Sequence, residues 1–224
     1  MMKNLARVSI LASALLTVFS AHAAKQAELK VTGVISPPSC DITLGANGIV
    51  DYGVISPSSL SRGAYTRHER KDVSFAITCN AKIRMALKTI DNRASSVVSG
   101  VSGTAAPDDW IYGLGTVGAS KVGGYMMFMP RNVITTDNEP ATQIFSVNGG
   151  AWIDTGAVSA TTGSGMLGKD RRFSWAAAGT TVPFAAQTVS GTISVRAYLN
   201  KPENLPLTQD VPLDGSVTLE VLYL

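Results

Sequence analysis

The stretch Val73-Ser74-Phe75-Ala76-Ile77-Thr78-Cys79 is the clearest structural signal in this chain of 224 residues. Apolar residues alternate with small or polar ones, which is the period of a strand with one buried face. Val73, Phe75, Ile77 and Cys79 fall on the same side of such a strand. We therefore expect a sheet protein in which Cys79 points into the core.

Further strands are expected on both sides of this stretch, because short apolar or alternating runs recur between turn residues. Residues 58–72 are polar and predict a loop or a solvated edge, and residues 94–108 predict a long loop. Asn148-Gly149-Gly150 is a strong hairpin signal. The predicted strands are 29–35, 49–55, 83–88, 110–112, 125–129, 144–147, 151–154, 171–176, 192–199 and 217–224. So many short strands indicate an all-β sandwich.

The amino-acid composition and net charge exclude several classes of protein. Hydrophobic residues make up 45% of the chain and charged residues 16%, with 21 glycines, which excludes a disordered or coiled-coil protein. The formal net charge of +3 is too small to indicate nucleic-acid binding. The simplest organisation is one domain over 24–224.

The N-terminus has the pattern of a secretory signal peptide. Residues 1–7 carry Lys3 and Arg7 without an acidic residue, residues 8–20 are apolar, and Ala21-His22-Ala23 matches a cleavage site. The apolar run is shorter than the roughly 20 residues that a membrane span needs. We expect residues 1–23 to be removed and the protein to be exported.

Cys40 and Cys79 are the two cysteines of the chain, and in an exported protein an isolated pair predicts a disulfide. A metal site or catalytic thiol would need partners that the sequence lacks. His68 is the one histidine beyond the predicted cleavage site, and no CxxC motif occurs.

Signals for an enzyme are weak. Residues 113–118 fit GxGxxG, but residues 119–127 do not predict a helix, so we interpret the motif as a connection between strands. His68 is expected in a loop, and no GxSxG motif occurs. We predict no catalytic residue, cofactor or metal. Trp110 and Trp152 could stack on a sugar, although such residues more often pack in a core or at an edge.

Three motifs and the C-terminus resemble chaperone–usher fimbrial subunits, which are pilin-like proteins of Gram-negative bacteria. The motifs are Gly33-Val34-Ile35-Ser36-Pro37-Pro38-Ser39-Cys40, Val50-Asp51-Tyr52-Gly53-Val54-Ile55 and the strand that ends at Cys79. The alternating end with penultimate Tyr223 is similar to the last pilin strand. The likeness covers 29–79 and 189–224 and is poor over 90–188, and the length is more like that of a fimbrial-like family than of a major pilin.

The resemblance implies an immunoglobulin-like, Greek-key sandwich that lacks its last strand, with extra strands or hairpins in the middle region. A periplasmic chaperone would supply the missing strand before the N-terminal extension of another fimbrial subunit replaces it during assembly at an outer-membrane usher. By this resemblance Val217, Leu219, Val221 and Tyr223 would face or border the groove and the chaperone. The donor segment would contain Ala27, Leu29 and Val31.

One feature departs from the fimbrial pattern. If the first strand begins near residue 29, the donor segment is a few residues shorter than that of a typical pilin. The protein could then have a short donor, be a terminal subunit, or be a self-complete periplasmic sandwich that uses a hairpin from its middle region. A surface or tip adhesin that binds a host glycan is the competing function.

Overall fold

The computed structural model describes residues 26–103, 105–157 and 165–224, and the predicted all-β class is confirmed there. The predicted signal peptide, residues 1–23, lies outside the described residues. No helix in the described ranges is long and apolar enough to cross a membrane. Besides the strands there are seven short 3-10 turns in those ranges: Gly45–Gly48, Pro57–Ser59, Ala94–Ser96, Asp108–Trp110, Arg131–Val133, Thr155–Ala157 and Pro202–Asn204.

The chain divides into two units, of which the first ends at Ser36 and the second comprises residues 37–224. The described part of the first unit, residues 26–36, has no regular structure, so the predicted strand at 29–35 is wrong. Its apolar side chains are exposed, Leu29 at 89% and Ile35 at 101%. An alternating sequence forms a strand only when a neighbouring backbone pairs with it, and none does here.

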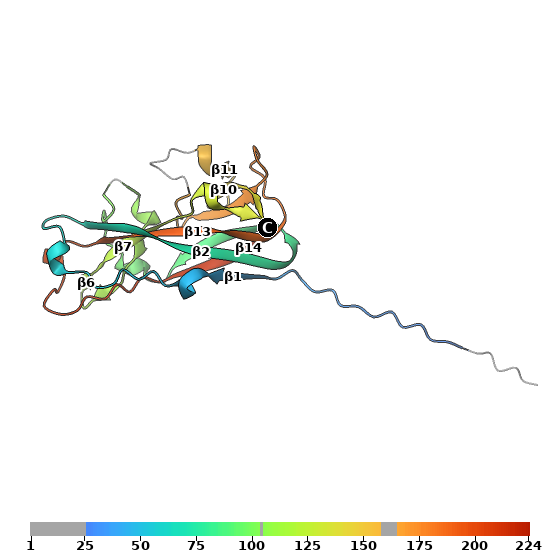
Figure 1. Ribbon diagram of the computed structural model, residues 1–224, viewed down its shortest axis with the longest axis horizontal. Coiled ribbons are helices and arrows are strands. Elements are labelled where there is room, and N and C mark those ends of the chain that lie inside the picture. The colour runs from blue at the N-terminus through green and yellow to red at the C-terminus, as the bar shows by residue number, and fades with distance from the viewer. Residues whose placement is uncertain (1–25, 104, 158–164) are drawn as a thin grey trace, which may run out of the picture. The chain divides into compact units, whose positions relative to one another are not determined.

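The first sheet of the second unit is antiparallel and is built on two long strands, which lie side by side in Figure 1. Its order is β1 (Cys40–Leu44), β2 (Thr66–Ile83), β13 (Ala186–Leu199), β7 (Gly123–Phe128) and β4 (Tyr112–Gly113). The short strands β8 (Thr135–Thr136) and β9 (Glu139–Pro140) form a hairpin that pairs with β13. Of the residues predicted as a loop or a solvated edge, 58–65 lie outside any strand and 66–72 form a largely exposed part of β2 that pairs with β13 alone.

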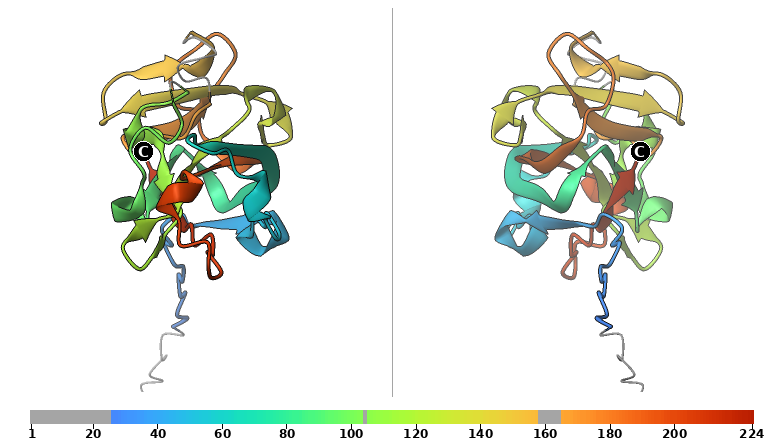
Figure 2. Two further views of the ribbon diagram at one scale, coloured as in Figure 1. Left: turned by 90° about the vertical axis from the view of Figure 1, so that its left-hand side faces the viewer. Right: turned by 90° about the vertical axis from the view of Figure 1, so that its right-hand side faces the viewer.

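The second sheet is also antiparallel, and the two sheets pack as the layers that are seen end-on in Figure 2. Its order is β11 (Trp152–Asp154), β10 (Thr142–Val147), β12 (Arg171–Ala176), β3 (Met85–Asp91) and β14 (Val217–Tyr223). The predicted hairpin between β10 and β11 is confirmed, with Asn148 and Gly149 at positive φ. A separate hairpin joins β5 (Thr116–Val117) and β6 (Ser120–Lys121), so the GxGxxG stretch connects strands, as the sequence predicts.

The strand order confirms the expected immunoglobulin-like sandwich. That fold places strands A, B, E and D in one sheet and C, F and G in the other. Here β1, β2, β13 and β7 take the places of A, B, E and D, while β3 and β14 take those of C and F. Within the described residues β14 pairs only with β3, so no strand lies in the position of G.

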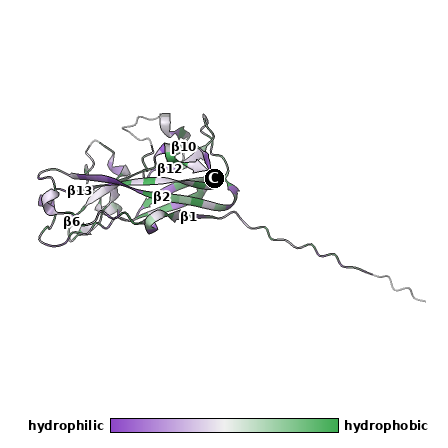
Figure 3. Ribbon diagram, viewed as in Figure 1, coloured by the Kyte–Doolittle hydropathy of each residue, from purple (hydrophilic) through white to green (hydrophobic). Residues whose placement is uncertain are grey.

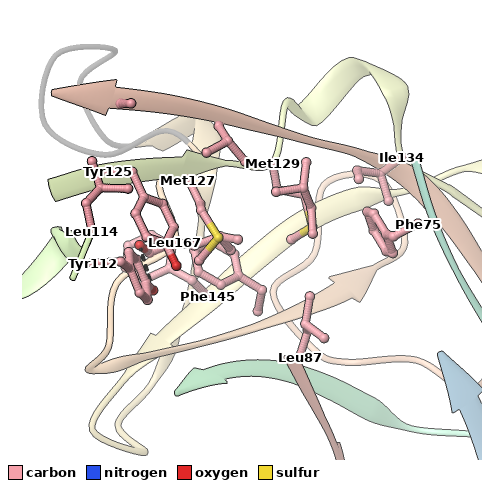
Figure 4. Close-up of a cluster of buried hydrophobic side chains, with 14 of the residues drawn as sticks. Phe75, Leu87, Tyr112, Leu114, Tyr125, Met127, Met129, Ile134, Phe145 and Leu167 are labelled. Atoms are coloured by element: carbon pink, nitrogen blue, oxygen red, sulfur yellow. Dashed lines mark hydrogen bonds between the residues drawn. The ribbon is translucent and has the colours of Figure 1, made fainter. Parts of the chain in front are cut away.

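The core lies between the sheets, and Figure 3 shows hydrophobic residues concentrated on the strands that enclose it. Phe75 and Met127 from the first sheet meet Leu87 and Phe145 from the second (Figure 4). Gly191 lies opposite Phe75, where a Cβ atom would come within 2.4 Å of the Ile134 side chain. A glycine is required there because Ile134 covers Phe75 at close range.

A second, smaller core covers the outer face of the first sheet. Met126 on β7 and Tyr198 on β13 point away from the main core and are buried under residues 97–111, the stretch that contains most of the predicted loop. The buried members from that stretch are Val101, Ala106 and Ile111.

Candidate functional site: an open apolar groove

An apolar groove lies between residues 44–55 and residues 205–219 of the second unit. It consists of two cavities of about 280 and about 350 Å³. Both cavities are lined by Val50, Tyr52 and Leu213, so they form one continuous groove. The core side chains at its floor are Val73, Tyr125, Met127, Ile193 and Val195.

The first rim of the groove, residues 50–55, has an unpaired backbone. The sequence predicts a strand at 49–55, but the segment is extended without pairing to any neighbour. In the described part of the chain, residues 50–55 make no backbone-to-backbone hydrogen bond. Lys71 Nζ donates to the Asp51 carbonyl at 2.6 Å, and Asp51 Oδ1 accepts from Gly53 N–H at 2.7 Å. These bonds hold the rim while its other backbone groups stay available.

The second rim, residues 211–216 together with β14, is unpaired along part of its length. The edge of β14 that faces away from β3 has no partner strand among the described residues, and residues 211–213 make no backbone-to-backbone hydrogen bond there. Arg93 fixes the start of this rim, because its Nε donates to Asp214 Oδ2 at 2.9 Å. That hydrogen bond also lowers the pKa of the Asp214 carboxyl.

The buried carboxyl group of Asp91, at the end of β3, holds the backbone of Arg93 in place. Its side chain is 1% exposed. It accepts from the backbone N–H of Arg93 at 2.9 Å and of Gly113 at 3.1 Å, and Lys169 Nζ lies 3.9 Å away. A buried carboxylate is tolerated because these donors compensate its charge. The second rim is therefore anchored to the body although its outer edge has no partner.

Apolar side chains on both rims are only half covered. Val217, Leu219 and Val221 of β14 pack against the core and stay partly exposed, as do Val50 and Tyr52 of the first rim. Of the residues expected to face or border the groove, Val217 and Leu219 line it directly. Val221 lies further along β14, and Tyr223 lies at its end, 52% exposed.

The disulfide lies beside the end of β14 in the second rim. The predicted bridge between Cys40 and Cys79 is confirmed, and the two residues lie directly opposite each other in the β1–β2 ladder. The Cys40 N–H donates to the hydroxyl of Tyr223 at 3.0 Å. The bridge and this hydrogen bond fasten β1 to β2 and to the end of β14.

The Tyr52 hydroxyl forms hydrogen bonds with the backbone of β13 at an irregularity in the β2–β13 pairing. The β2–β13 register slips between Arg196 and Tyr198, which leaves Ala197 without a one-to-one partner on β2. The Tyr52 hydroxyl accepts from Ala197 N–H at 3.1 Å and donates to the Val195 carbonyl at 3.0 Å. Burial raises the pKa of this phenol, so the hydroxyl keeps the proton that it donates.

His68 lies in β2 beside this irregularity, and its prediction as a loop residue is wrong. Its ring meets Tyr52 edge-on at 5.7 Å between centroids. Its Nε2 is buried without a hydrogen-bond partner in the part of the chain that the structure describes, and burial lowers the pKa of the imidazole. The neutral ring packs against Tyr52 behind the groove lining.

Tyr125 is a residue of the groove floor that carries a hydroxyl group. Its ring stacks on Tyr112 at 5.4 Å between centroids, and the two rings lie together in Figure 4. The Tyr112 hydroxyl pairs with Thr89 Oγ1 at 2.6 Å and with the Leu167 carbonyl at 3.2 Å, whereas the Tyr125 hydroxyl has no hydrogen bond within the described residues. Burial raises the pKa of Tyr125 far above that of a free phenol. Tyr125 therefore stays a neutral phenol at the floor of the groove.

Other residues singled out in the sequence lie apart from the groove. Trp110 stacks on the guanidinium of Arg171 at 3.8 Å, and Trp152 lies in β11 opposite Ser146. No contact among the described residues joins the two tryptophans. Ala27, Leu29 and Val31 belong to the first unit, where all three are exposed. In the described ranges no group of three His, Cys, Asp or Glu side chains could hold a metal ion.

Sequence reasoning missed Tyr125 and the structural role of Tyr52. Tyr52 stands in a motif that resembles fimbrial subunits, but its role depends on an irregularity in two other strands. Tyr125 has the pattern of an ordinary core residue. The groove combines unpaired backbone edges with half-covered apolar side chains, which are the features that an added strand uses at a sheet edge.

The chain is similar to bacterial proteins along most of its length. A family described as "Protein of unknown function (DUF1120)" matches residues 29–126. Protein GltF of Escherichia coli (strain K12) is 26% identical over 257 residues, covering 99% of this chain and 98% of the relative. The uncharacterized protein YhcF of the same strain is 23% identical over 234 residues, covering 96% of this chain and 98% of the relative.

Proposed function

We propose that the protein is an exported, non-enzymatic structural subunit of a fimbrial-like surface assembly. The observation that carries this proposal is the open groove of an immunoglobulin-like sandwich in which no described strand occupies the place beside β14. An unpaired sheet edge invites pairing with another chain. A strand from outside would use main-chain hydrogen bonds for affinity and alternate side chains for specificity.

A periplasmic chaperone would fill the groove first, and the N-terminal segment of another subunit would then replace it by donor-strand exchange. The oxidised cysteine pair supports passage through an oxidising compartment. In this proposal the subunit passes through the periplasm and an outer-membrane usher before it reaches the cell surface.

The segment that precedes β1 supports a role as donor. Because β1 begins at Cys40 and not near residue 29, all of 26–39 precedes the first strand. Ala27, Leu29, Val31 and Ile35 alternate with other residues and are exposed. At about 3.3 Å per residue a segment of nine residues spans about 30 Å, which exceeds the length of the seven-residue β14. The short donor inferred from the sequence is thus no obstacle.

A peptide-binding experiment tests the groove. A synthetic peptide with the sequence of residues 26–36 is added to the purified protein and its affinity is measured by fluorescence anisotropy. We expect saturable binding, and at least tenfold weaker binding when the peptide carries Leu29→Lys and Val31→Lys. The protein variant Leu219→Lys should lose binding because it puts a charge into the groove.

The matched control is Ile153→Lys, which adds the same charge to a 39% exposed apolar position on β11. It should bind the peptide like the wild type. Equal affinity for both peptides, or equal loss in both protein variants, would contradict the proposal. Co-purification from periplasm supplies the second test, in which a chaperone should accompany the wild type and be lost with Leu219→Lys.

A further inference from the structure

Two arginines face each other across strands on the outer face of the first sheet. Arg70 on β2 and Arg196 on β13 are direct partners in the antiparallel register. The neighbours of Arg196 along β13, Val195 and Ala197, both point into the core, so Arg196 points outward. Arg67 pairs with Tyr198 and adds a third guanidinium to the same face. Like charges directly opposite each other destabilise a sheet.

A second row of basic residues shows how the protein compensates such a pair elsewhere. In the second sheet Arg172 is opposite Lys88, and Lys88 is opposite Glu220 on its other side. The Lys88 Nζ lies 4.0 Å from Glu220 Oε2. The row of Arg70 and Arg196 continues to Met126 and contains no acid.

No side-chain hydrogen bond or ion pair within the described residues involves Arg67, Arg70 or Arg196. Asp72 is exposed on the same face two residues from Arg70, but it forms no ion pair there. Arg196 is half-buried, and its Nε is buried without an acceptor. A guanidinium N–H that has lost water without gaining a partner is unfavourable.

The ring of Phe128 orients the side chain of Arg70. The Arg70 guanidinium lies over the ring of Phe128 on β7, 4.2 Å from its centroid, so the side chain extends across β13. Phe128 is opposite Ser194 on β13, so the guanidinium reaches the row next to the one that contains Arg196. Phe128 is itself packed at the margin of the second core. The ring contact limits the freedom of the Arg70 side chain.

We infer that Arg70 and Arg196 bind a tetrahedral oxyanion, a phosphate or sulfate group, with Arg67 adding positive charge at the margin. A bound oxyanion would offset the repulsion between the two guanidiniums. Planar guanidiniums match such oxyanions through paired hydrogen bonds. The group can be a free ion or the phosphate of a lipid headgroup. This inference does not rest on the proposed function, because the site lies on the outer face of the sheet.

Calorimetric titration with sodium phosphate, and separately with sodium sulfate, at constant ionic strength tests the site. We expect wild-type protein to bind, and the variant with Arg70→Gln and Arg196→Gln to bind at least tenfold more weakly. The matched control carries Lys88→Gln and Arg172→Gln, which removes two positive charges from the other row. Its affinity should stay within twofold of the wild type.

Flotation with vesicles distinguishes the two sources of the phosphate group. If the headgroup is the ligand, phosphatidylglycerol vesicles should bind the wild type and the control but not the arginine variant, and phosphatidylcholine vesicles should bind none. Binding of free phosphate alone identifies a soluble ion, and also supports the site. The single variant Arg70→Gln changes an exposed side chain and tests the site if the double variant fails to fold. Absence of binding in both assays, or equal loss in the control, would overturn the inference.

Discussion

The molecule has two apolar surfaces outside its closed core, and the chain covers one of them but not the other. On the outer face of the first sheet, Met126 and Tyr198 are 1% and 4% exposed because residues 97–111 lie over them. Along the groove, Leu219 and its neighbours on β14 remain half exposed. Both surfaces are apolar, so hydrophobicity alone does not explain the difference.

The backbone accounts for the difference. The covering loop satisfies its own polar groups, for example through Val98 N–H, which donates to the Gly123 carbonyl at 3.4 Å, and through the turn closed by Val101 N–H and the Val98 carbonyl at 3.2 Å. A cover for the groove would have to pair with β14 and with residues 50–55 at once, which requires an extended strand. No described part of the second unit supplies one.

The largest expected effect concerns the disulfide that joins β1 to β2 beside the end of β14. Replacing both Cys40 and Cys79 by serine releases a loop with a sequence separation of 39 residues. The free energy of unfolding should fall by about 2–5 kcal/mol, as for native bridges in small secreted domains. Urea unfolding with and without reductant measures it, and wild-type protein that is indifferent to reductant would contradict the prediction.

A pair of truncations compares the two apolar surfaces directly. Met126→Ala should lower the free energy of unfolding by about 2–5 kcal/mol because it leaves a cavity in the covered core. Leu219→Ala should cost about 1 kcal/mol or less in the isolated protein, because water already reaches that side chain. Equal losses in urea unfolding would mean that the groove is as well packed as the second core. With a bound peptide, the loss at Leu219 should increase.

Tyr52→Phe tests how much the two hydrogen bonds of the Tyr52 hydroxyl stabilise the floor of the groove. The variant leaves the Ala197 N–H and the Val195 carbonyl without the hydroxyl that pairs with both. We expect a loss of about 1–3 kcal/mol, the usual cost of buried unpaired polar groups. Hydrogen exchange of the Ala197 amide should accelerate in the variant, and an unchanged rate would show that water replaces the hydroxyl without cost. Tyr125→Phe, which removes a hydroxyl without a partner, is the control.

The smallest effect is expected from Asp137, which ties the β8–β9 hairpin to β13. Hydrogen bonds from the Thr188 and Gln187 N–H groups and a 2.9 Å contact with Lys82 lower the pKa of its carboxyl to about 2. Because the folded pKa lies below the unfolded one, this stabilisation is complete above about pH 4 and is lost as the pH falls toward 2.

The contribution of Asp137 should be about 1 kcal/mol or less, since the carboxyl is near the surface. Asp137→Asn should remove this part of the acid dependence in thermal unfolding measured from pH 5 to pH 2. A variant with the same acid dependence as the wild type would contradict the assignment.

Sequence patterns predicted the strands that have a buried face. The alternation at 73–79, 192–199 and 217–224 is matched by β2, β13 and β14, and the Asn148-Gly149-Gly150 signal is matched by the β10–β11 hairpin. The prediction failed at 29–35 and 49–55, where the residues alternate but no neighbouring strand pairs with them. At 66–72 the second alternative, a solvated edge, is the correct one, because these charged residues belong to a part of β2 that pairs with β13 alone.

The candidate site was predictable only in part. The alternating face of Val217 and Leu219 is visible in the sequence, since alternation is a local property of a strand. The pairing of Arg70 with Arg196 and the bond from Tyr52 to Ala197 join residues more than 120 positions apart, and a slip of one residue in the β2–β13 register would abolish both.

The sequence by itself determined which segments form strands, which of their faces are apolar and that the cysteines pair, because these depend on short-range periodicity and on residue type. Only the tertiary structure decided that the edge of β14 has no partner strand among the described residues. It also decided that Arg70 and Arg196 are opposite each other in a row without an acidic residue. Both depend on which strands become neighbours, and neighbours are chosen by the packing of the whole sandwich.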